Sequence, residues 1–142
     1  MRLIFLSRRN AARSQMAEGF LKHYAGDRFE VHSAGMKPTG LHPLAVQVMA
    51  EVGIDISQQE SKGTRAYLGR LAVSYAIFVC PEGEATCPAI WPFGGMRLRW
   101  PFDDPAAFEG SEAARVEKFR AVRDQIEARI KEWLAKVMPK QA

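Results

Sequence analysis

The stretch LIFLSRRNAARS, residues 3–14, combines an apolar run, a tight loop and the start of a helix. Its apolar run shows no polar alternation, which is typical of a strand buried in a parallel sheet. A strand–loop–helix order directs backbone N–H groups and a helix N-terminus at one point, where an anion can bind. The spacing of five residues between Ser7 and Arg13 is by itself a weak signal, because turns of this length are common. The helix that starts after the loop, and the loops after the other expected strands, favour a binding loop. The residues predicted to bind the oxyanion are Ser7, Arg8, Arg9, Asn10, Ala11, Ala12 and Arg13.

Length and composition indicate one ordinary globular domain. The chain has 142 residues, 47% of them hydrophobic and 25% charged, with a net charge of +4 at pH 7. No apolar run approaches the roughly 18 residues of a membrane span, and the N-terminus lacks the long apolar core of a signal peptide. The mild positive charge suits an anionic substrate but gives little support for nucleic-acid binding. We therefore expect a cytoplasmic monomer without membrane or nucleic-acid partners.

Apolar runs that alternate with amphipathic segments predict an α/β fold. We expect one three-layer domain over residues 1–142, with a four-stranded parallel sheet and helices on both faces. Ser14 is expected to cap the first helix through its hydroxyl. Ligands of such sheets bind beyond the carboxyl ends of the strands, so Ser7, Cys80 and the loop after Trp100 can meet at one edge. The expected strands are residues 2–6, 29–33, 73–80 and 96–100, and the expected helices are residues 14–24, 43–52 and 111–137.

Arg13 and Ser7 determine the chemistry of the predicted loop. A guanidinium can clamp two oxygens of a tetrahedral anion. A Cys at position 7 would be ionised by the helix terminus and Arg13, but the chain has Ser7, whose hydroxyl has a far higher proton affinity. His23, His32 and His42 show no triad pattern that would supply a base. We therefore expect Ser7 to lie beside the anion without attacking it.

Cys80 and Cys87 follow the strongest strand signal, residues 73–80. Their spacing is uncommon for zinc, no second pair or nearby His completes a ligand set, and a structural disulfide is not expected in the cytosol. One interpretation is a reversible thiol relay, in which one thiol attacks an oxidised centre and the next resolves it. The other is two unrelated small hydrophobic residues, and the spacing favours neither.

Asp103 and Asp104 precede Pro105 in the loop after the last expected strand. Pro105 rigidifies the turn and favours an extended Asp104. A carboxyl group that projects over the anion loop can donate a proton to a leaving oxygen. We expect Asp104 to be this acid, and Asp103 to belong to a solvated turn.

With these features together, the chain resembles the arsenate reductases of the low-molecular-weight tyrosine phosphatase family, from Arg2 to about Val137. The run over residues 13–18 and the Cys80/Cys87 pair favour arsenate reductases over true tyrosine phosphatases. The matching segments are NAARSQMAEG (residues 10–19), HSAG (32–35), VGIDIS (52–57), Val79-Cys80, Cys87-Pro88 and WPFDDP (100–105).

The resemblance implies both a fold and a reaction. Backbone amides and Arg13 would hold arsenate. Residue 7 would attack arsenic while Ser14 hydrogen-bonds residue 7, and Asp104 would protonate the departing oxygen. Cys80 would then attack the residue-7 sulfur and release arsenite, and Cys87 would attack Cys80. A thioredoxin or glutaredoxin-type thiol donor would reduce the final disulfide, with no tightly bound cofactor. In some members potassium binds at positions that match Asn10, Glu18 and Ser33.

The chain departs from the family pattern at position 7. Ser7 cannot enter a disulfide cascade, so the resemblance implies that reduction fails outright. A natural loss of the nucleophile and a Cys-to-Ser variant made to trap substrate both fit. Three alternatives therefore stay open: a disabled arsenate reductase, a phosphotyrosine phosphatase and a non-catalytic oxyanion-binding protein, with arsenate, phosphate or sulfate as ligand. The loop over residues 106–108 offers only Phe108 to stack on a phosphotyrosine ring, which disfavours the phosphatase.

Overall fold

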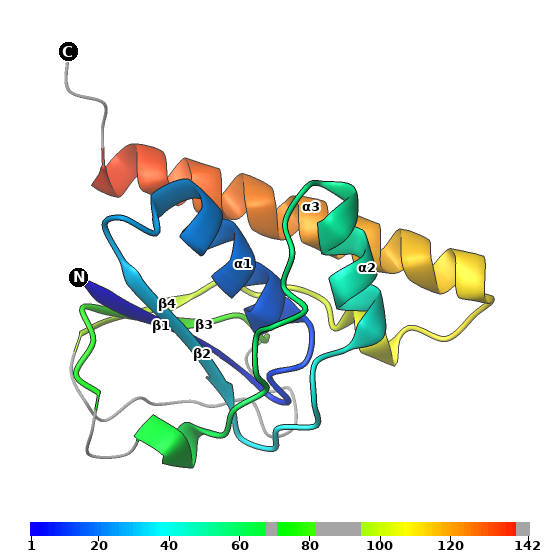
Figure 1. Ribbon diagram of the computed structural model, residues 1–142, viewed down its shortest axis with the longest axis horizontal. Helices are drawn as coiled ribbons and strands as arrows, with labels where there is room; N and C mark the ends of the chain where they lie inside the picture. The colour runs from blue at the N-terminus through cyan, green and yellow to red at the C-terminus, as the bar shows by residue number, and fades with distance from the viewer. Residues whose placement is uncertain (68–70, 82–94, 139–142) are drawn as a thin grey trace.

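Four parallel strands form the centre of the computed structural model, which describes residues 1–67, 71–81 and 95–138 (Figure 1). The strands lie in the order β2-β1-β3-β4, and every pairing is parallel. The carboxyl ends of β1, β2 and β3 therefore meet at one edge, where Ser7 of β1 pairs with Gly35 of β2. The bounds are β1 Arg2–Ser7, β2 Glu30–Gly35, β3 Tyr75–Phe78 and β4 Met96–Arg99.

The two faces of the sheet are covered unequally. Leu3 and Phe5 of β1 face a core shared with all three α-helices, whereas Ile4 and Leu6 face the opposite side, where Tyr67 of the 3-10 turn η1 packs. Helical elements thus lie on both faces, as expected, but the described α-helices share one of them. The bounds are α1 Arg13–Ala25, α2 Pro43–Glu51, α3 Glu112–Val137, η1 Thr64–Tyr67 and η2 Pro105–Ala107.

Helix α3 spans Glu112–Val137, close to the expected range of residues 111–137. Ser111 caps it, because its hydroxyl accepts a hydrogen bond from the Ala114 amide at 3.1 Å. Charged residues cover the solvent side of the helix, as its periodicity predicts. The buried apolar residues are Val116, Phe119, Val122, Ile126 and Ile130, and Arg123 is buried among them.

The expected cap of α1 is wrong. The N-cap residue is Ala12, which makes no side-chain cap hydrogen bond, and Ser14 lies buried inside the first turn. Its hydroxyl is instead hydrogen-bonded to Ser7 and Asn10. The sequence suggested that the Ser14 hydroxyl caps the helix, which is a common role of serine at a helix start. In the structure the same hydroxyl instead bonds to residues of the loop.

The strand expected over residues 73–80 is shorter in the structure. β3 covers Tyr75–Phe78, although Val79 still donates its N–H to Leu6 O at 2.9 Å and both Val79 and Cys80 are fully buried. The chain therefore remains beside β1 up to the point where the loop begins. Among the described helices, none is long and apolar enough to cross a membrane.

Candidate active site

The loop after β1 is held open toward one side by backbone bonds on its other side. Three amides of the segment after β2 donate to loop carbonyls: Lys37 to Arg8 at 2.9 Å, Thr39 to Arg9 at 3.2 Å and His42 to Ala11 at 2.9 Å. With these carbonyls bound outward, the neighbouring amides can face inward.

Ala11 and Ala12 contribute two amides to this loop. Among the described residues, the N–H groups of Ala11 and Ala12 donate to no acceptor, although both residues are buried. Buried amides are nearly always satisfied, so this pair indicates a ligand that accepts hydrogen bonds. Gly35 allows the close packing behind the loop, because a Cβ there would lie 2.7 Å from Asn10 N.

Asn10 fixes the turn of the loop. Its φ is +49°, in the left-handed region that Asn tolerates better than most residues. Its Nδ2 donates to Ser14 Oγ at 2.8 Å, and its Oδ1 accepts from Gln15 Nε2 at 2.9 Å and from the Lys62 amide at 2.7 Å. The side chain is therefore fully used in holding the loop together.

Ser7 is the last residue of β1, directly before the loop. Its Oγ is 2.7 Å from Ser14 Oγ and accepts a hydrogen bond from the Asn10 amide at 3.1 Å. The residue is buried, with 3% of its surface exposed. Donors that converge on one atom at the end of β1 stabilise negative charge there, as a nucleophile requires.

Arg13 and Asp104 lie close to each other near the loop. Arg13 is buried, donates from Nη1 to Phe102 O at 3.1 Å, and has Nη2 3.8 Å from Asp104 Oδ2. The other oxygen of Asp104 accepts from the Ala106 amide at 3.0 Å, which caps η2. Asp103 is exposed and pairs with Lys118 at 3.0 Å, so the two aspartates have different surroundings.

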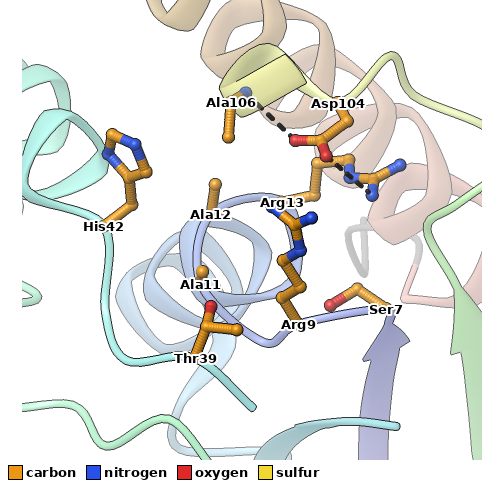
Figure 2. A pocket seen from close by; sticks show the side chains of 9 residues that line it. All are labelled: Ser7, Arg9, Ala11, Ala12, Arg13, Thr39, His42, Asp104 and Ala106. Atoms are coloured by element: carbon orange, nitrogen blue, oxygen red, sulfur yellow. Dashed lines mark hydrogen bonds and ion pairs between the residues drawn. The ribbon is translucent and has the colours of Figure 1, made fainter. Parts of the chain in front are cut away.

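A small pocket joins these groups, and Figure 2 shows the side chains arranged around it. Of the predicted oxyanion residues, Arg8 and Asn10 do not line it. Among its walls are Thr39, His42 and Ala106, which were not predicted. The lining residues are Ser7, Arg9, Ala11, Ala12, Arg13, Thr39, His42, Asp104 and Ala106.

His42 is the residue that sequence reasoning missed most clearly. It is the N-cap of α2, where its Nδ1 accepts from the Leu44 amide at 3.1 Å. Burial and the nearby Arg115 lower the pKa of the imidazole, against a smaller opposing effect of Asp104. The available signal was a His directly before Pro43, at the start of a helix that follows a strand ending at the site.

Cys80 follows β3, which is the neighbour of β1, and is fully buried. Its carbonyl oxygen accepts from Arg99 Nη1 at 3.0 Å, and its sulfur is disulfide-bonded. Cys87, the second predicted relay residue, lies outside the described residues. The relay itself stays a prediction.

The residues matched to a potassium site, Asn10, Glu18 and Ser33, are engaged with other protein groups in the described part of the structure. Glu18 and Ser33 meet, with Ser33 Oγ donating to Glu18 Oε1 at 2.5 Å, but the Asn10 oxygen is used by Gln15 and Lys62. Two ammonium groups already flank Glu18, that of Lys22 at 2.5 Å and that of Lys62 at 3.9 Å. A further cation would meet like charges there, so these residues fit it poorly.

The profile of the low molecular weight phosphotyrosine protein phosphatase family matches residues 2–142. An arsenate reductase of Shouchella clausii is 47% identical over 131 residues, which cover 92% of this chain and 93% of that protein. The arsenate reductase of Bacillus subtilis is 42% identical over the same shares.

Solved structures of related proteins have the same fold. An arsenate reductase described in the phosphate binding state superposes with a TM-score of 0.79 at 33% identity, over 96% of this chain and 98% of that one. The tyrosine phosphatase AmsI of Erwinia amylovora shares the fold, with a TM-score of 0.75 at 17% identity over 96% of this chain and 93% of that one. The loop after β1 and the full-length matches lead to one assignment: the chain belongs to the low molecular weight phosphotyrosine protein phosphatase family.

Proposed function

We propose that this protein is an arsenate reductase of the thiol-relay type whose site binds arsenate, phosphate or sulfate, and that Ser7 blocks its turnover. The observation that carries the proposal is the environment of Ser7 Oγ, 2.7 Å from Ser14 Oγ and 3.1 Å from the Asn10 amide. Such a position suits an ionised nucleophile. The relatives named arsenate reductases, at 42% and 47% identity, support arsenate as the substrate.

The proposed reaction begins at residue 7, where a thiolate is required. The thiolate attacks arsenic, and one arsenate oxygen leaves as water after Asp104 gives it a proton. Cys80 then attacks the residue-7 sulfur. The sulfur–arsenic bond breaks, its electron pair stays on arsenic, arsenite leaves, and a disulfide between residue 7 and Cys80 remains.

The relay ends at the second cysteine. Cys87 attacks Cys80, residue 7 regains its thiolate, and the Cys80–Cys87 disulfide is reduced by an external dithiol of the thioredoxin or glutaredoxin type in the cytoplasm. A Corynebacterium glutamicum relative, 30% identical, is described as thioredoxin-dependent. The buried, disulfide-bonded Cys80 at the end of β3 supports this role.

Ser7 stops this sequence at its first step. A serine hydroxyl is mostly un-ionised in the same environment, and an oxygen bound to arsenic offers Cys80 no sulfur to attack. The anion site itself does not depend on the sulfur, because its donors are amides and Arg13. Oxyanion binding without reduction is therefore the expected behaviour.

The walls of the pocket favour a bare oxyanion over phosphotyrosine. Ala11, Ala12, Thr39 and Ala106 line it, and among the described lining residues the one aromatic ring is that of His42. Phe108, the residue considered for stacking, is 40% exposed and is not part of the wall. An aryl phosphate would find little surface to stack on.

The test restores the nucleophile. We expect the Ser7→Cys variant to reduce arsenate when a thioredoxin system supplies electrons, and the parent chain to show no turnover while binding phosphate by calorimetry. Arg13→Ala in either background should weaken phosphate binding about 100-fold, because a buried charge-assisted pair is lost. An inactive Ser7→Cys protein that still binds phosphate would overturn the reductase assignment.

A further inference from the structure

His42 is held in place from three sides beside the oxyanion loop. Its backbone N–H donates to Ala11 O at 2.9 Å, which ties it to the loop. Its Nδ1 accepts from the Leu44 amide at 3.1 Å, which ties it to α2, and its ring packs 4.7 Å from the ring of Phe119 on α3. The imidazole is therefore positioned before any ligand arrives.

These contacts decide which ring nitrogen carries the proton. Because Nδ1 accepts the Leu44 N–H, the neutral ring must carry its hydrogen on Nε2. The two nitrogens of an imidazole point in divergent directions, so Nε2 points away from the start of α2. Figure 2 shows the ring at the edge of the pocket, on the side of Ala12 and Ala106. Among the described residues, none makes a hydrogen bond to Nε2.

We propose that His42 is a specificity-determining residue of this pocket, whose Nε2–H donates a hydrogen bond to the outermost oxygen of the bound oxyanion. The loop amides and Arg13 take the inner oxygens of a tetrahedral anion, which leaves one oxygen directed toward the mouth of the pocket. A free oxyanion accepts a hydrogen bond there. A phosphomonoester places its ester oxygen and carbon group there, so it gains less from the donor.

This inference rests on the proposed function only in requiring that the pocket binds an oxyanion. It does not require turnover, so it is tested on the chain as it stands, with Ser7 in place. The two probes are inorganic phosphate and phenyl phosphate, measured by calorimetry at pH 7.5. Their affinity ratio reports the selectivity for the free oxyanion.

Two substitutions separate the two nitrogens of His42. Asn places an acceptor near the position of Nδ1 and is a preferred N-cap residue, so His42→Asn keeps the cap and removes the Nε2–H donor. Gln reaches the position of Nε2, so His42→Gln keeps a donor in the pocket and loses the cap. His23→Asn, on the exposed side of α1, is the matched control.

We expect His42→Asn to weaken phosphate binding about 10-fold and phenyl phosphate binding about 2-fold, with the melting temperature unchanged. His42→Gln should keep phosphate affinity within about 2-fold and lower the melting temperature by about 2–4 °C, since a cap is lost. His23→Asn should change neither affinity.

Three results would contradict these expectations in different ways. If His42→Asn binds phosphate as tightly as the parent, Nε2 does not touch the anion and the inference is wrong. If both His42 variants lose phosphate affinity equally, the residue acts only through the shape of the loop, and the inference is again wrong. If the parent chain itself binds no phosphate, the oxyanion site of the proposed function fails together with the inference.

Discussion

Two carboxylates lie close to the oxyanion loop and differ in how they are paired. Glu18 accepts from Ser33 and Lys22, each at 2.5 Å, with Lys62 at 3.9 Å, and its side chain is 4% exposed. Asp104 lines the pocket at 14% exposure, with Arg13 at 3.8 Å. The one close donor to its carboxylate among the described residues is the Ala106 amide at 3.0 Å.

The difference in pairing suits Glu18 to stabilising the fold and Asp104 to proton transfer. A carboxylate surrounded by matched donors stabilises the fold but has no capacity left for a reaction. A carboxylate that is loosely paired and faces a cavity can hold a proton and pass it on. The sequence alone does not reveal this distinction, because each residue follows a strand of the same parallel sheet, Glu18 on α1 after β1 and Asp104 in the loop after β4.

The largest effect is expected from Asp104. In the Ser7→Cys background, Asp104→Asn should lower the rate of arsenate reduction about 100-fold, because the leaving oxygen loses its proton donor. Phosphate affinity should change little, since Asn still caps η2 through the Ala106 amide. Single-turnover kinetics with arsenate, together with phosphate calorimetry, measure both quantities.

The control for this substitution is the neighbouring residue. Asp103→Asn removes an equal charge from an exposed side chain that pairs with Lys118 at 3.0 Å, outside the pocket. Its rate should match that of the Ser7→Cys parent. Equal losses for both aspartates would mean that only the local negative charge matters, and would end the contrast between Asp104 and Glu18.

A smaller effect, on stability, is expected from Glu18. Glu18→Gln should lower the free energy of unfolding by about 2 kcal/mol, because Lys22 and Ser33 lose a buried charged acceptor. Glu132→Gln is the matched control, since Glu132 also pairs with a lysine four residues on, Lys136, but at the surface. It should cost less than about 0.5 kcal/mol in urea unfolding. A similar loss in both variants would show that the Glu18 cluster contributes no more than an exposed pair.

Potassium offers a second test of the Glu18 cluster. Because Lys22 and Lys62 already bring positive charge to Glu18, replacing sodium chloride by potassium chloride at constant ionic strength should leave the melting temperature unchanged. A rise specific to potassium would restore the cation site that the family resemblance implied at Asn10, Glu18 and Ser33.

The fold was predictable because its signals are local. β1 reads as a continuous apolar run since it is buried between two strands, and the stripe of α3 repeats at helical spacing over its whole length. Ser14 was misassigned for the opposite reason. Its hydroxyl makes contacts to Ser7 and Asn10 that exist only once the loop has closed.

The site was predictable only where the motif itself contains it. Ser7, Arg13 and Asp104 stand in recognisable patterns, and the structure places all three around one pocket. His42 stands in none, because its position depends on the Ala11 carbonyl and on the ring of Phe119, which is remote in sequence. Contacts between distant segments are what a single sequence conceals.

A further expected effect concerns His42, which lines the same pocket as Asp104. Burial and Arg115 lower its pKa below the ordinary value of 6.5, with Asp104 opposing them. The folded protein therefore resists protonation more than the unfolded chain does, so stability is fully present above about pH 6.5 and declines as the pH falls below it. Protonation at Nδ1 removes the hydrogen bond from the Leu44 amide. The expected loss in the free energy of unfolding is therefore about 1 kcal/mol, the usual contribution of a cap.

Urea unfolding at pH 8.0, 6.5 and 5.5 measures this decline. His42→Asn keeps the cap and has no ring to protonate, so its stability should fall less than that of the parent over the same range, while carboxylates elsewhere contribute equally to both proteins. Identical slopes would mean that His42 titrates alike in the folded and unfolded states.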